Sequence, residues 1–235
     1  MTAQFQVLSP ERPIVVFDVL GTLVDQAGSL RRRVSAVTGF DREATIALVD
    51  GWLDGVAAQE QAIVRGDRGF ASSDQLDAEV LQGLARRHVV PADVIPDLVG
   101  ASAHSAPWDG AAAAIRSLAN VATVVGLSNA SRRALTGLSV TADFRWHQLL
   151  SAEDARTYKP DPAMYQLAMS SVPQTALPPF MVAAHAWDLR AAKAVGMRTA
   201  YVPRPNADGP RVGERFDLHA TSLEDLEAQL RAELP

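Results

Sequence analysis

The sequence predicts an α/β protein built on a parallel β-sheet, and two observations carry this prediction. Short apolar runs of the kind found in buried strands alternate with segments whose apolar residues recur at helical spacing. Strands that alternate with helices are joined by crossover connections, which produce a parallel sheet with helices on its faces. Ligands bind beyond the carboxyl ends of such strands, so the residues after each strand are the first candidates for a site.

The first strand is expected at residues 14–17, a continuous apolar run that follows Pro13 and ends at Asp18. The next long segment, residues 26–102, is polar and favours helices, because its apolar residues recur at intervals of three and four. This spacing is clear in two groups, which are Ile46, Val49, Leu53 and Val56, and then Leu76, Val80, Leu81 and Leu84.

After Pro107, strands and helices alternate along the rest of the chain. Gly196 is suited to end the helix before it, since glycine often occupies the position after a helix. Helices are expected at residues 110–118, from about 132, and at 161–170, 189–195 and 223–230, and strands at 121–127, 149–150, 180–184 and 199–202.

Composition and charge exclude several classes of function. The chain has 235 residues, 48% of them apolar, and a formal net charge of −5, which gives no electrostatic case for nucleic acid or an anionic membrane. It has no cysteine, which excludes thiol catalysis and disulfides. We recognise no signal peptide, and no apolar run approaches the ~20 residues that cross a bilayer. We therefore expect a soluble, cytoplasmic protein whose partner is a small molecule, with no nucleic-acid or membrane partner.

Polar side chains follow four of the expected strands. Asp18 follows the first strand and Ser128 and Asn129 follow the second. Lys159 lies in the loop after the third strand, and residues 185–188 follow the fourth. Because the carboxyl ends of parallel strands meet at one edge of a sheet, we expect these groups to converge.

Each of these residues also has a purely structural explanation. Asp18 or Asp188 could cap a turn or a helix, and Ser128 could be the N-cap of the following helix. Lys159 could be an exposed loop lysine. The remaining candidates could simply pack in the core, and these are Tyr165, His185 and Trp187. Only the ordered set of residues favours a functional site.

Four segments resemble the motifs of the haloacid dehalogenase superfamily, in the family's order. They are residues 17–23 (FDVLGTL), 126–129 (GLSN), 158–162 (YKPDP) and 184–188 (AHAWD). Each motif is weak by itself, but the four together are specific.

This resemblance implies a Rossmann-like parallel-sheet core with an inserted α-helical cap domain. The core corresponds to residues 1–24 and 104–235, and the cap corresponds to residues 25–103. A cap of this kind closes over the site, excludes water and holds the substrate.

Most members of this superfamily are magnesium-dependent phosphatases, but two positions favour the dehalogenase branch. A phosphatase needs an acid two residues after the nucleophile to protonate the leaving alcohol, and Leu20 stands there. Mg²⁺ prefers oxygen ligands, and the phosphatases supply them with a pair of acids four residues apart in the fourth motif, where Ala184 leaves Asp188 alone. Displacement of a halide needs neither group, because halide leaves as a stable anion. We therefore expect no metal and no cofactor.

The chain most resembles the type II (S)-2-haloacid dehalogenases, and this implies a role for each candidate. Asp18 attacks the halogen-bearing carbon to form an aspartyl ester, and water hydrolyses the ester to release a 2-hydroxy acid. Lys159 supports Asp18, and Asp188 pairs with Lys159 and helps to place the water. His185 is a candidate general base, since its ordinary pKa is near ~6.5. The implied substrate-binding residues are Leu20, Thr22, Ser128, Asn129, Tyr165 and Trp187.

The sequence departs from the dehalogenase pattern in three places. Leu20 replaces an aromatic residue, while Ala183 and His185 replace a serine and an asparagine. Leu53 stands where this branch carries an arginine on a cap helix. Two alternatives therefore stay open, which are a phosphatase-like hydrolase acting on another small substrate and a binding protein without catalysis.

Two further expectations concern the cap. Arg65 and Arg68 are the candidates to replace the missing arginine. Family members often dimerise, so a homodimer is expected, with apolar cap residues such as Trp52 as candidates for the contact.

Overall fold

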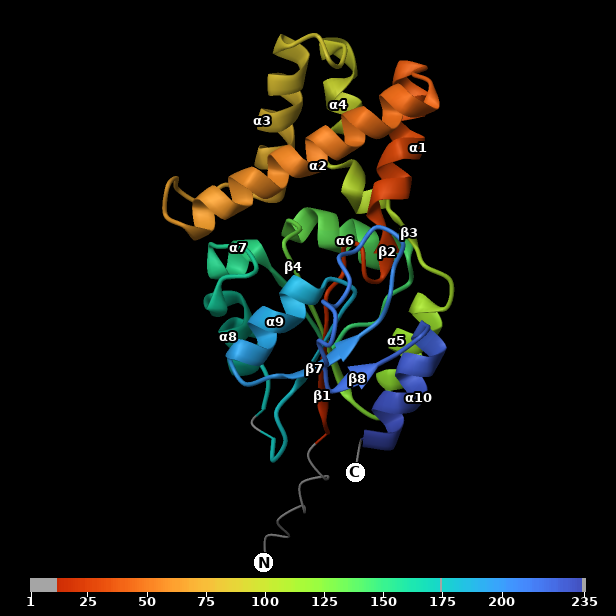
Figure 1. The fold of residues 1–235 in the computed structure, drawn as a ribbon, viewed down its shortest axis with the longest axis vertical. Helices are drawn as coiled ribbons and strands as arrows, with labels where there is room; N and C mark the ends of the chain where they lie inside the picture. Colours follow the sequence, from red (N-terminus) through yellow and green to blue (C-terminus); the bar gives the residue numbers. More distant parts are fainter. Residues whose placement is uncertain (1–11, 174, 234–235) are drawn as a thin grey trace, which may run out of the picture.

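The structure, a computed structural model, describes residues 12–173 and 175–233 and confirms the predicted α/β class. Six strands form one sheet in which all neighbouring strands are parallel, in the order β5-β4-β1-β6-β7-β8 (Figure 1). The strands are β1 (Ile14–Phe17), β4 (Thr123–Ser128), β5 (Gln148–Ser151), β6 (Phe180–Ala183), β7 (Arg198–Tyr201) and β8 (Leu218–His219).

Strand β1 lies inside the sheet, and the later strands are added first on one side of it and then on the other. β4 and β5 extend the sheet on one side, whereas β6, β7 and β8 extend it on the other. The strand order therefore reverses at β1, and ligands bind in the crevice beyond the carboxyl end at such a point. Asp18 directly follows β1 at this end.

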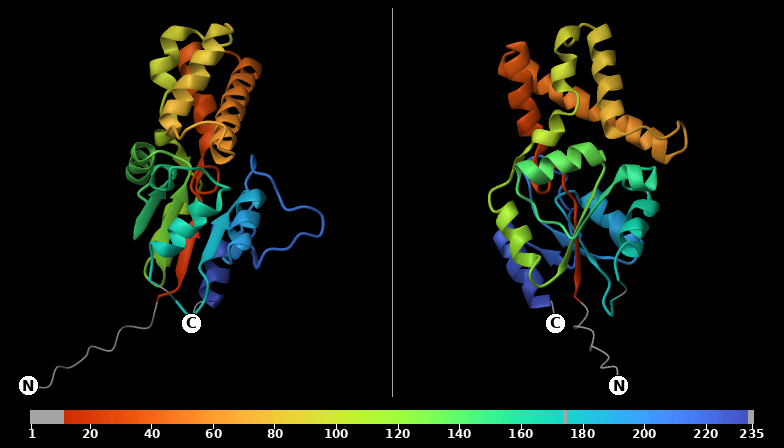
Figure 2. Two further views of the ribbon diagram at one scale, coloured as in Figure 1. Left: turned by 90° about the vertical axis from the view of Figure 1, so that its left-hand side faces the viewer. Right: turned by 180° about the vertical axis from the view of Figure 1, so that it is seen from behind.

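Helices lie on both faces of the sheet (Figure 1; Figure 2). Phe17 of β1 packs with α5, α6 and α10 in one apolar cluster, and Val16 packs with α8 and α9 in another. Successive side chains of a strand point to opposite faces, so a strand covered on both faces has to be apolar throughout. The helices are α5 (Ala111–Leu118), α6 (Arg132–Thr141), α7 (Ala152–Ala155), α8 (Pro162–Ser170), α9 (Ala186–Ala194) and α10 (Leu223–Glu233).

A second group of helices, called here the cap helices, stands beyond the carboxyl ends of the strands (Figure 1). Their apolar faces form a core of their own, which includes Leu48, Leu81 and Leu98. Trp52 is fully buried in this core, and its indole N–H donates to Asp77 Oδ1 at 2.8 Å. The group comprises α1 (Gln26–Thr38), α2 (Arg42–Val64), α3 (Ser73–Arg86), η1 (Ala92–Val94), α4 (Ile95–Leu98) and η2 (Ala101–His104).

Both chain connections between the sheet and the cap helices run through one short ribbon. β2 (Val24–Asp25) pairs antiparallel with β3 (Ala106–Pro107). Asp25 also begins α1, because its carboxylate accepts the N–H of Gly28 at 2.9 Å. The predicted division into a core (1–24 and 104–235) and a cap (25–103) has its boundaries near this ribbon, and it stays a prediction.

The structure differs from the sequence prediction at several short elements. α9 begins at Ala186, three residues before the predicted start, with His185 as its N-cap. β2, β3 and β8 have two residues each, which is too short for a recognisable hydrophobic period. The prediction that Trp52 contacts a partner subunit is wrong, because this side chain is already buried within its own chain.

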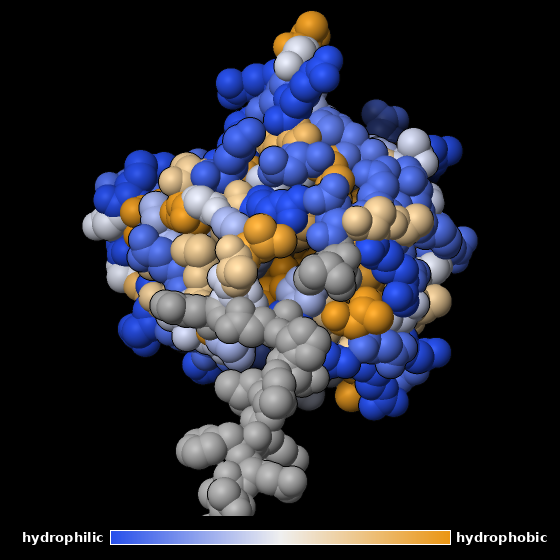
Figure 3. Space-filling model, turned by 90° about the horizontal axis from the view of Figure 1, so that it is seen from below, coloured by the Kyte–Doolittle hydropathy of each residue, from blue (hydrophilic) through white to orange (hydrophobic). Residues whose placement is uncertain are grey.

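Few large apolar side chains are exposed among the described residues. Figure 3, which views the end opposite the cap helices, shows hydrophobic residues in small groups among hydrophilic ones. Val140 on α6 and Val212 in the loop before β8 are the most exposed of the large apolar residues described. Scattered exposure of this kind is normal. Within the described residues, no helix combines the length and apolar character required to span a membrane.

The buried carboxyl of Asp77 should make the fold less stable as the pH rises. Burial raises the pKa of Asp77 to about 7, although the hydrogen bond from Trp52 opposes this shift. The folded chain then keeps a proton that the unfolded chain loses near pH ~4, so the stabilisation is complete below that pH and is lost as the pH rises to about 7. We expect the free energy of unfolding, measured with urea, to fall by roughly 4 kcal/mol over this window, since each unit of pKa shift corresponds to about 1.4 kcal/mol.

Two variants separate Asp77 from other acids in this prediction. Asp77→Asn keeps an oxygen for the Trp52 N–H but cannot ionise, so its unfolding free energy should vary less between pH 4.5 and 7.5. Asp54→Asn removes an exposed acid on α2 and should keep the wild-type dependence. Equal slopes for Asp77→Asn and the wild type would show that Asp77 is not the titrating group.

Candidate active site

The loop after β1 presents Asp18 beside the neighbouring strand β6. The Asp18 N–H donates to the carbonyl of Val182 at 2.9 Å, and the residue is only 5% exposed. Thr22 Oγ1 donates to Asp18 Oδ2 at 2.6 Å and accepts the N–H of Ala184 at 2.9 Å. Thr22 therefore connects the carboxylate of Asp18 to the end of β6.

Lys159 connects Asp18 to a second carboxylate, that of Asp188. Its Nζ donates to Asp18 Oδ1 at 2.7 Å and to Asp188 Oδ2 at 2.6 Å. Asp188 lies in the first turn of α9, is fully buried, and accepts a hydrogen bond from the hydroxyl of Tyr165 at 2.6 Å. With Thr22, these contacts give a donor to each of the four carboxylate oxygens. We call these residues (Asp18, Thr22, Lys159, Tyr165 and Asp188) the carboxylate cluster.

The two acids keep Lys159 charged and Tyr165 protonated. Burial opposes the charge of Lys159, but the carboxylates of Asp18 and Asp188 outweigh it and raise the pKa of Lys159. Burial, together with the charge of Asp188, raises the pKa of Tyr165, so its hydroxyl remains a donor. Two carboxylates and one ammonium leave the cluster with a net charge of −1 when both acids are ionised.

The structure decides between the structural and the functional explanations of several of these residues. Lys159 is not an exposed loop lysine, since it is 4% exposed. Ser128 is not the N-cap of α6, because Ser131 accepts the N–H of Ala134 at 3.0 Å and fills that position. Tyr165, expected at the substrate, is instead fully buried behind Asp188 and positions that carboxylate.

A cavity of about 170 Å³ opens directly in front of Asp18 and Lys159, between the core and the cap helices. A ligand inside it would contact both parts of the chain. On the core side, its other lining residues are Leu20, Ser128, Asn129, His185 and Trp187. The structure thus brings residues from separate strand ends to one cavity, whereas Asp188 is buried against Lys159 and does not line it.

One face of α2 forms the roof of this cavity. It contributes Leu53, Val56, Ala57 and Glu60, which recur at intervals of three and four and so share one side of the helix. Leu53, at the position of the missing arginine, therefore does face the site. Glu60 was not predicted as a site residue. The sequence did contain an indication of this role, because Glu60 lies two helical turns after Leu53 and therefore on the same face of α2.

Neither arginine proposed as a replacement lines the inner cavity in the described part of the chain. Arg65 lies in an adjoining outer hollow of about 370 Å³ and pairs with Asp67 at 2.8 Å. Arg68 pairs with Glu79 at 2.9 Å on the surface of the cap helices. The inner cavity consequently has Lys159 as its cationic group among the described residues.

His185 stands beside the loop that carries Asp18. Its Nδ1 lies 3.4 Å from Oδ1 of Asp208, in the loop between β7 and β8, and its ring lies 5.8 Å from that of Trp187. A Cβ on Gly21 would lie 2.8 Å from His185 Nε2, and Gly21 has a φ of 81°. Only glycine suits this position, for both its space and its backbone conformation.

One aromatic and one cationic side chain hydrogen-bond to the backbone of the loop that carries Asp18. Trp108 Nε1 donates to the carbonyl of Gly21 at 3.3 Å, and Arg204 Nε donates to the carbonyl of Thr22 at 2.9 Å. The guanidinium of Arg204 also lies 5.3 Å from the centre of the Trp108 ring. These contacts fix the loop backbone, and the carboxylate of Asp18 with it.

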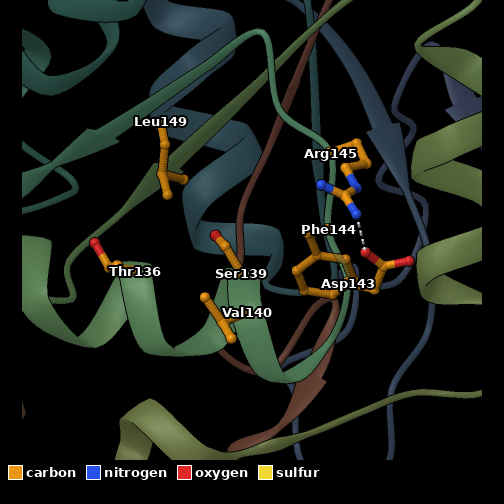
Figure 4. Close-up of a pocket in the computed structure, with 7 residues that line it drawn as sticks. All are labelled: Thr136, Ser139, Val140, Asp143, Phe144, Arg145 and Leu149. Carbon is orange, nitrogen blue, oxygen red and sulfur yellow. Dashed lines mark ion pairs between the residues drawn. The ribbon is translucent and has the colours of Figure 1, made fainter.

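A separate hollow lies on α6 and the edge strand β5, away from the carboxylate cluster (Figure 4). Val140 and Leu149 line it beside the ion pair of Asp143 and Arg145, whose atoms are 2.7 Å apart. It shares no lining residue with the cavity at Asp18, so it is not part of the candidate active site.

The residues at Asp18 do not fit a Mg²⁺ site of the phosphatase type. All four oxygens of Asp18 and Asp188 already accept hydrogen bonds from the chain, and Ala184 supplies no third carboxylate. In the described part of the chain, no three acids or histidines gather in a way that could hold a metal ion.

Comparison with known proteins identifies the family. The chain matches the family model of haloacid dehalogenase-like hydrolases over residues 13–196, which is more than half of its 235 residues. The chain therefore belongs to the haloacid dehalogenase-like hydrolases, and the resemblance inferred from the four motifs is confirmed.

Its relatives narrow the likeness to one branch. (S)-2-Haloacid dehalogenases from Pseudomonas fluorescens and Pseudomonas putida are each 30% identical to it over 106 residues, or 44% of this chain and 47% of each relative. The match thus spans about half the length of these curated relatives. The solved structures of an L-2-haloacid dehalogenase and of a defluorinating L-2-haloacid dehalogenase align with TM-scores of 0.82 and 0.83. They are 28% and 27% identical, and the alignments cover 93% and 94% of this chain and 99% and 95% of theirs.

Removal of the buried cation should strongly destabilise the fold. Lys159→Met leaves the carboxylates of Asp18 and Asp188 buried without a counter-charge, and loss of one partner of such a group costs about 3–5 kcal/mol. Adding Asp188→Asn to this variant removes one uncompensated charge and should recover part of the loss. Urea unfolding of the single and double variants measures both effects.

The exposed lysine on α9 provides the control. Lys193→Met should change the free energy of unfolding by less than about 0.5 kcal/mol. Strictly additive losses in Lys159→Met and Asp188→Asn would contradict the coupling of these two residues.

Proposed function

We propose that this chain hydrolyses the carbon–halogen bond of a small 2-haloacid, giving a 2-hydroxy acid and halide. The observation that carries the proposal is the Lys159 ammonium between the carboxylates of Asp18 and Asp188, with Asp18 at the wall of a cavity between the core and the cap helices. This arrangement supplies a nucleophile that is charge-compensated by the chain itself and needs no metal ion.

In the first step, an oxygen of Asp18 forms a bond to carbon 2 of the acid. The carbon–halogen bond breaks, and the halide leaves with the bonding electron pair. Leu20 has no proton to give, and none is needed, because halide is a weak base. The product of this step is an ester on Asp18, and Thr22 and Lys159 keep the attacking carboxylate in place.

In the second step, water adds to the ester carbonyl of Asp18. His185 is the proposed acceptor of the water proton: an N–H at Nδ1 faces Asp208 and leaves Nε2 free to accept. The alkoxide of the product takes a proton as it leaves, and Asp18 returns as a carboxylate that carries one oxygen from water. The overall reaction releases one proton, one halide ion and the 2-hydroxy acid.

Cavity size and relatives support this substrate class over a phosphate ester. A volume of about 170 Å³ is below the ~300 Å³ of ordinary ligand pockets and suits a molecule of a few heavy atoms. The engaged oxygens of Asp18 and Asp188 also disfavour a magnesium-dependent phosphatase. The (S)-2-haloacid dehalogenases to which the chain is similar favour the same class.

Loss of the nucleophile should abolish the reaction. We expect the wild type to release halide from a panel of 2-chloro- and 2-bromo-acids in the presence of EDTA. In Asp18→Asn the rate of halide release should be at least about 10³-fold lower. Asp109→Asn, an exposed acid, should retain it. A single turnover in ¹⁸O-water should place ¹⁸O in Asp18, as read by mass spectrometry. Halide release that survives in Asp18→Asn, or that stops with EDTA, would refute the proposal.

The role of His185 has a kinetic signature of its own. His185→Ala should still form the ester, because halide leaves before water is activated. We therefore expect a burst of one halide per active site, followed by turnover slowed by about 10²-fold, which rapid quench and halide detection would resolve. His104→Ala, which removes an exposed histidine at the end of η2, is the control. An unchanged steady rate in His185→Ala would exclude His185 as the base.

A further inference from the structure

The carboxyl of Glu60 enters the cavity from the cap helices, opposite Asp18. Glu60 lies on the face of α2 that carries Leu53, and it lines both the inner cavity and the adjoining outer hollow. Its side chain keeps part of its surface open to this space, yet it is enclosed between α2 and the core. An acid therefore occupies the side of the cavity where this branch of the family was expected to carry an arginine.

The hydrogen bonds of Asn129 fix the geometry of this acid. The backbone N–H of Lys159 donates to Asn129 Oδ1 at 2.9 Å, and a backbone N–H can only donate. The amide nitrogen of Asn129 must then face Glu60, and it donates to Glu60 Oε2 at 2.8 Å. Oε2 is thereby occupied as an acceptor, so a proton on this carboxyl is carried by Oε1. Within the described residues, Oε1 has no hydrogen-bond partner of its own.

Several charged or titratable groups act on Glu60, and they come from every element packed around it. Burial raises the pKa of Glu60 to about 8, with Asp77 of α3 adding to the shift and Asn129 and Lys159 opposing it. Asp18 faces it across the cavity, and His185 lines the same cavity. Two further groups are Tyr158, which is close enough for Glu60 to raise its pKa, and Arg65 on the wall of the outer hollow. Near neutral pH, the acid consequently holds its proton.

The charge balance of the cavity determines how a proton on Glu60 affects the binding of an anion. With both of its acids ionised, the carboxylate cluster has a net charge of −1, and the inner cavity has Lys159 as its cationic group among the described residues. An ionised Glu60 would bring the site to −2 and would repel a substrate carboxylate. A protonated Glu60 adds no charge and offers an O–H to an anion.

We propose that Glu60 is the substrate-selecting hydrogen-bond donor of this cavity and binds the carboxylate of a small 2-substituted acid through its O–H, in place of a cationic side chain. The identity of the ligand rests on the proposed function. The placement of the donor rests on α2, Asn129 and the cavity. Glu60 forms no covalent bond and exchanges no electrons. It contributes to catalysis only by holding the substrate.

This role ties substrate binding to pH in a defined direction. At a pH below the pKa of Glu60 the donor is present and affinity for the anion is constant. Above it, each pH unit removes about nine-tenths of the protonated form, so the dissociation constant of an anionic ligand should rise about tenfold per unit. A neutral ligand of the same shape should lose far less, because ionised Glu60 does not repel it.

The test uses the product analogue lactate and its neutral isostere lactamide, so that no turnover is needed. Their dissociation constants are measured by calorimetry between pH 6.5 and 9.5 for the full chain. For the wild type we expect lactate binding to weaken about tenfold from pH 8.5 to 9.5, and lactamide binding to change little. Glu60→Gln replaces the O–H by an N–H donor that cannot ionise, and its lactate affinity should stay constant over this range.

Glu43→Gln is the matched control, since Glu43 is an exposed acid in the first turn of the same helix, and this variant should behave as the wild type. Infrared spectra provide a second measurement, in which a protonated carboxyl band at pH 7 should be lost in Glu60→Gln. If Glu60→Gln does not fold, the comparison of lactate with lactamide in the wild type still decides the question.

The outcomes separate this proposal from the proposed function. If halide is released from 2-haloacids but lactate binding does not change with pH, or declines equally in Glu60→Gln, the role of Glu60 is refuted and the function stands. If the wild type neither releases halide nor binds lactate at any pH, both the proposed function and the role of Glu60 are refuted.

Discussion

The arrangement of this molecule depends on one ammonium group placed between two carboxylates. Lys159 is contributed by the segment before α8, Asp18 by the end of β1 and Asp188 by the first turn of α9, so a single cation connects three elements that are far apart in the chain. Buried charges are tolerated only when they are paired and hydrogen-bonded. The end of β1 at Phe17, the turn at Gly21 and the start of α9 at Ala186 place these carboxylates where Lys159 can pair with both.

Most of the core, and the identity of the charged groups in it, could be predicted from the sequence for a physical reason. A parallel sheet buried on both faces needs continuous apolar strands, and such runs stand out in residues 14–17 and 180–184. Polar residues directly after these runs have to lie at the carboxyl edge. Asp18, Lys159 and Asp188 were therefore identifiable together, because chain order and strand direction alone bring them to one place.

The parts that escaped prediction depend on packing between elements. Glu60 is one of many charged residues on an amphipathic helix, and only its spacing from Leu53 indicates that it shares the face that meets the core. Tyr165 and Trp52 are similar cases, since an aromatic side chain on a helix face can line a ligand, contact a partner or complete a core. Their hydrogen bonds to Asp188 and Asp77 decide the matter, and each joins residues more than twenty positions apart.

The β2–β3 ribbon has a mechanical consequence for the cavity. Both covalent links to the cap helices pass through it side by side, and β2 begins two residues after Thr22. A rotation of the cap helices about this ribbon therefore has its pivot next to the nucleophile and its largest displacement at the far end of α2. Such a rotation moves the roof of the cavity further than it moves Asp18 and its partners. A single pair of antiparallel strands thus separates the motion that admits a ligand from the geometry that the reaction needs.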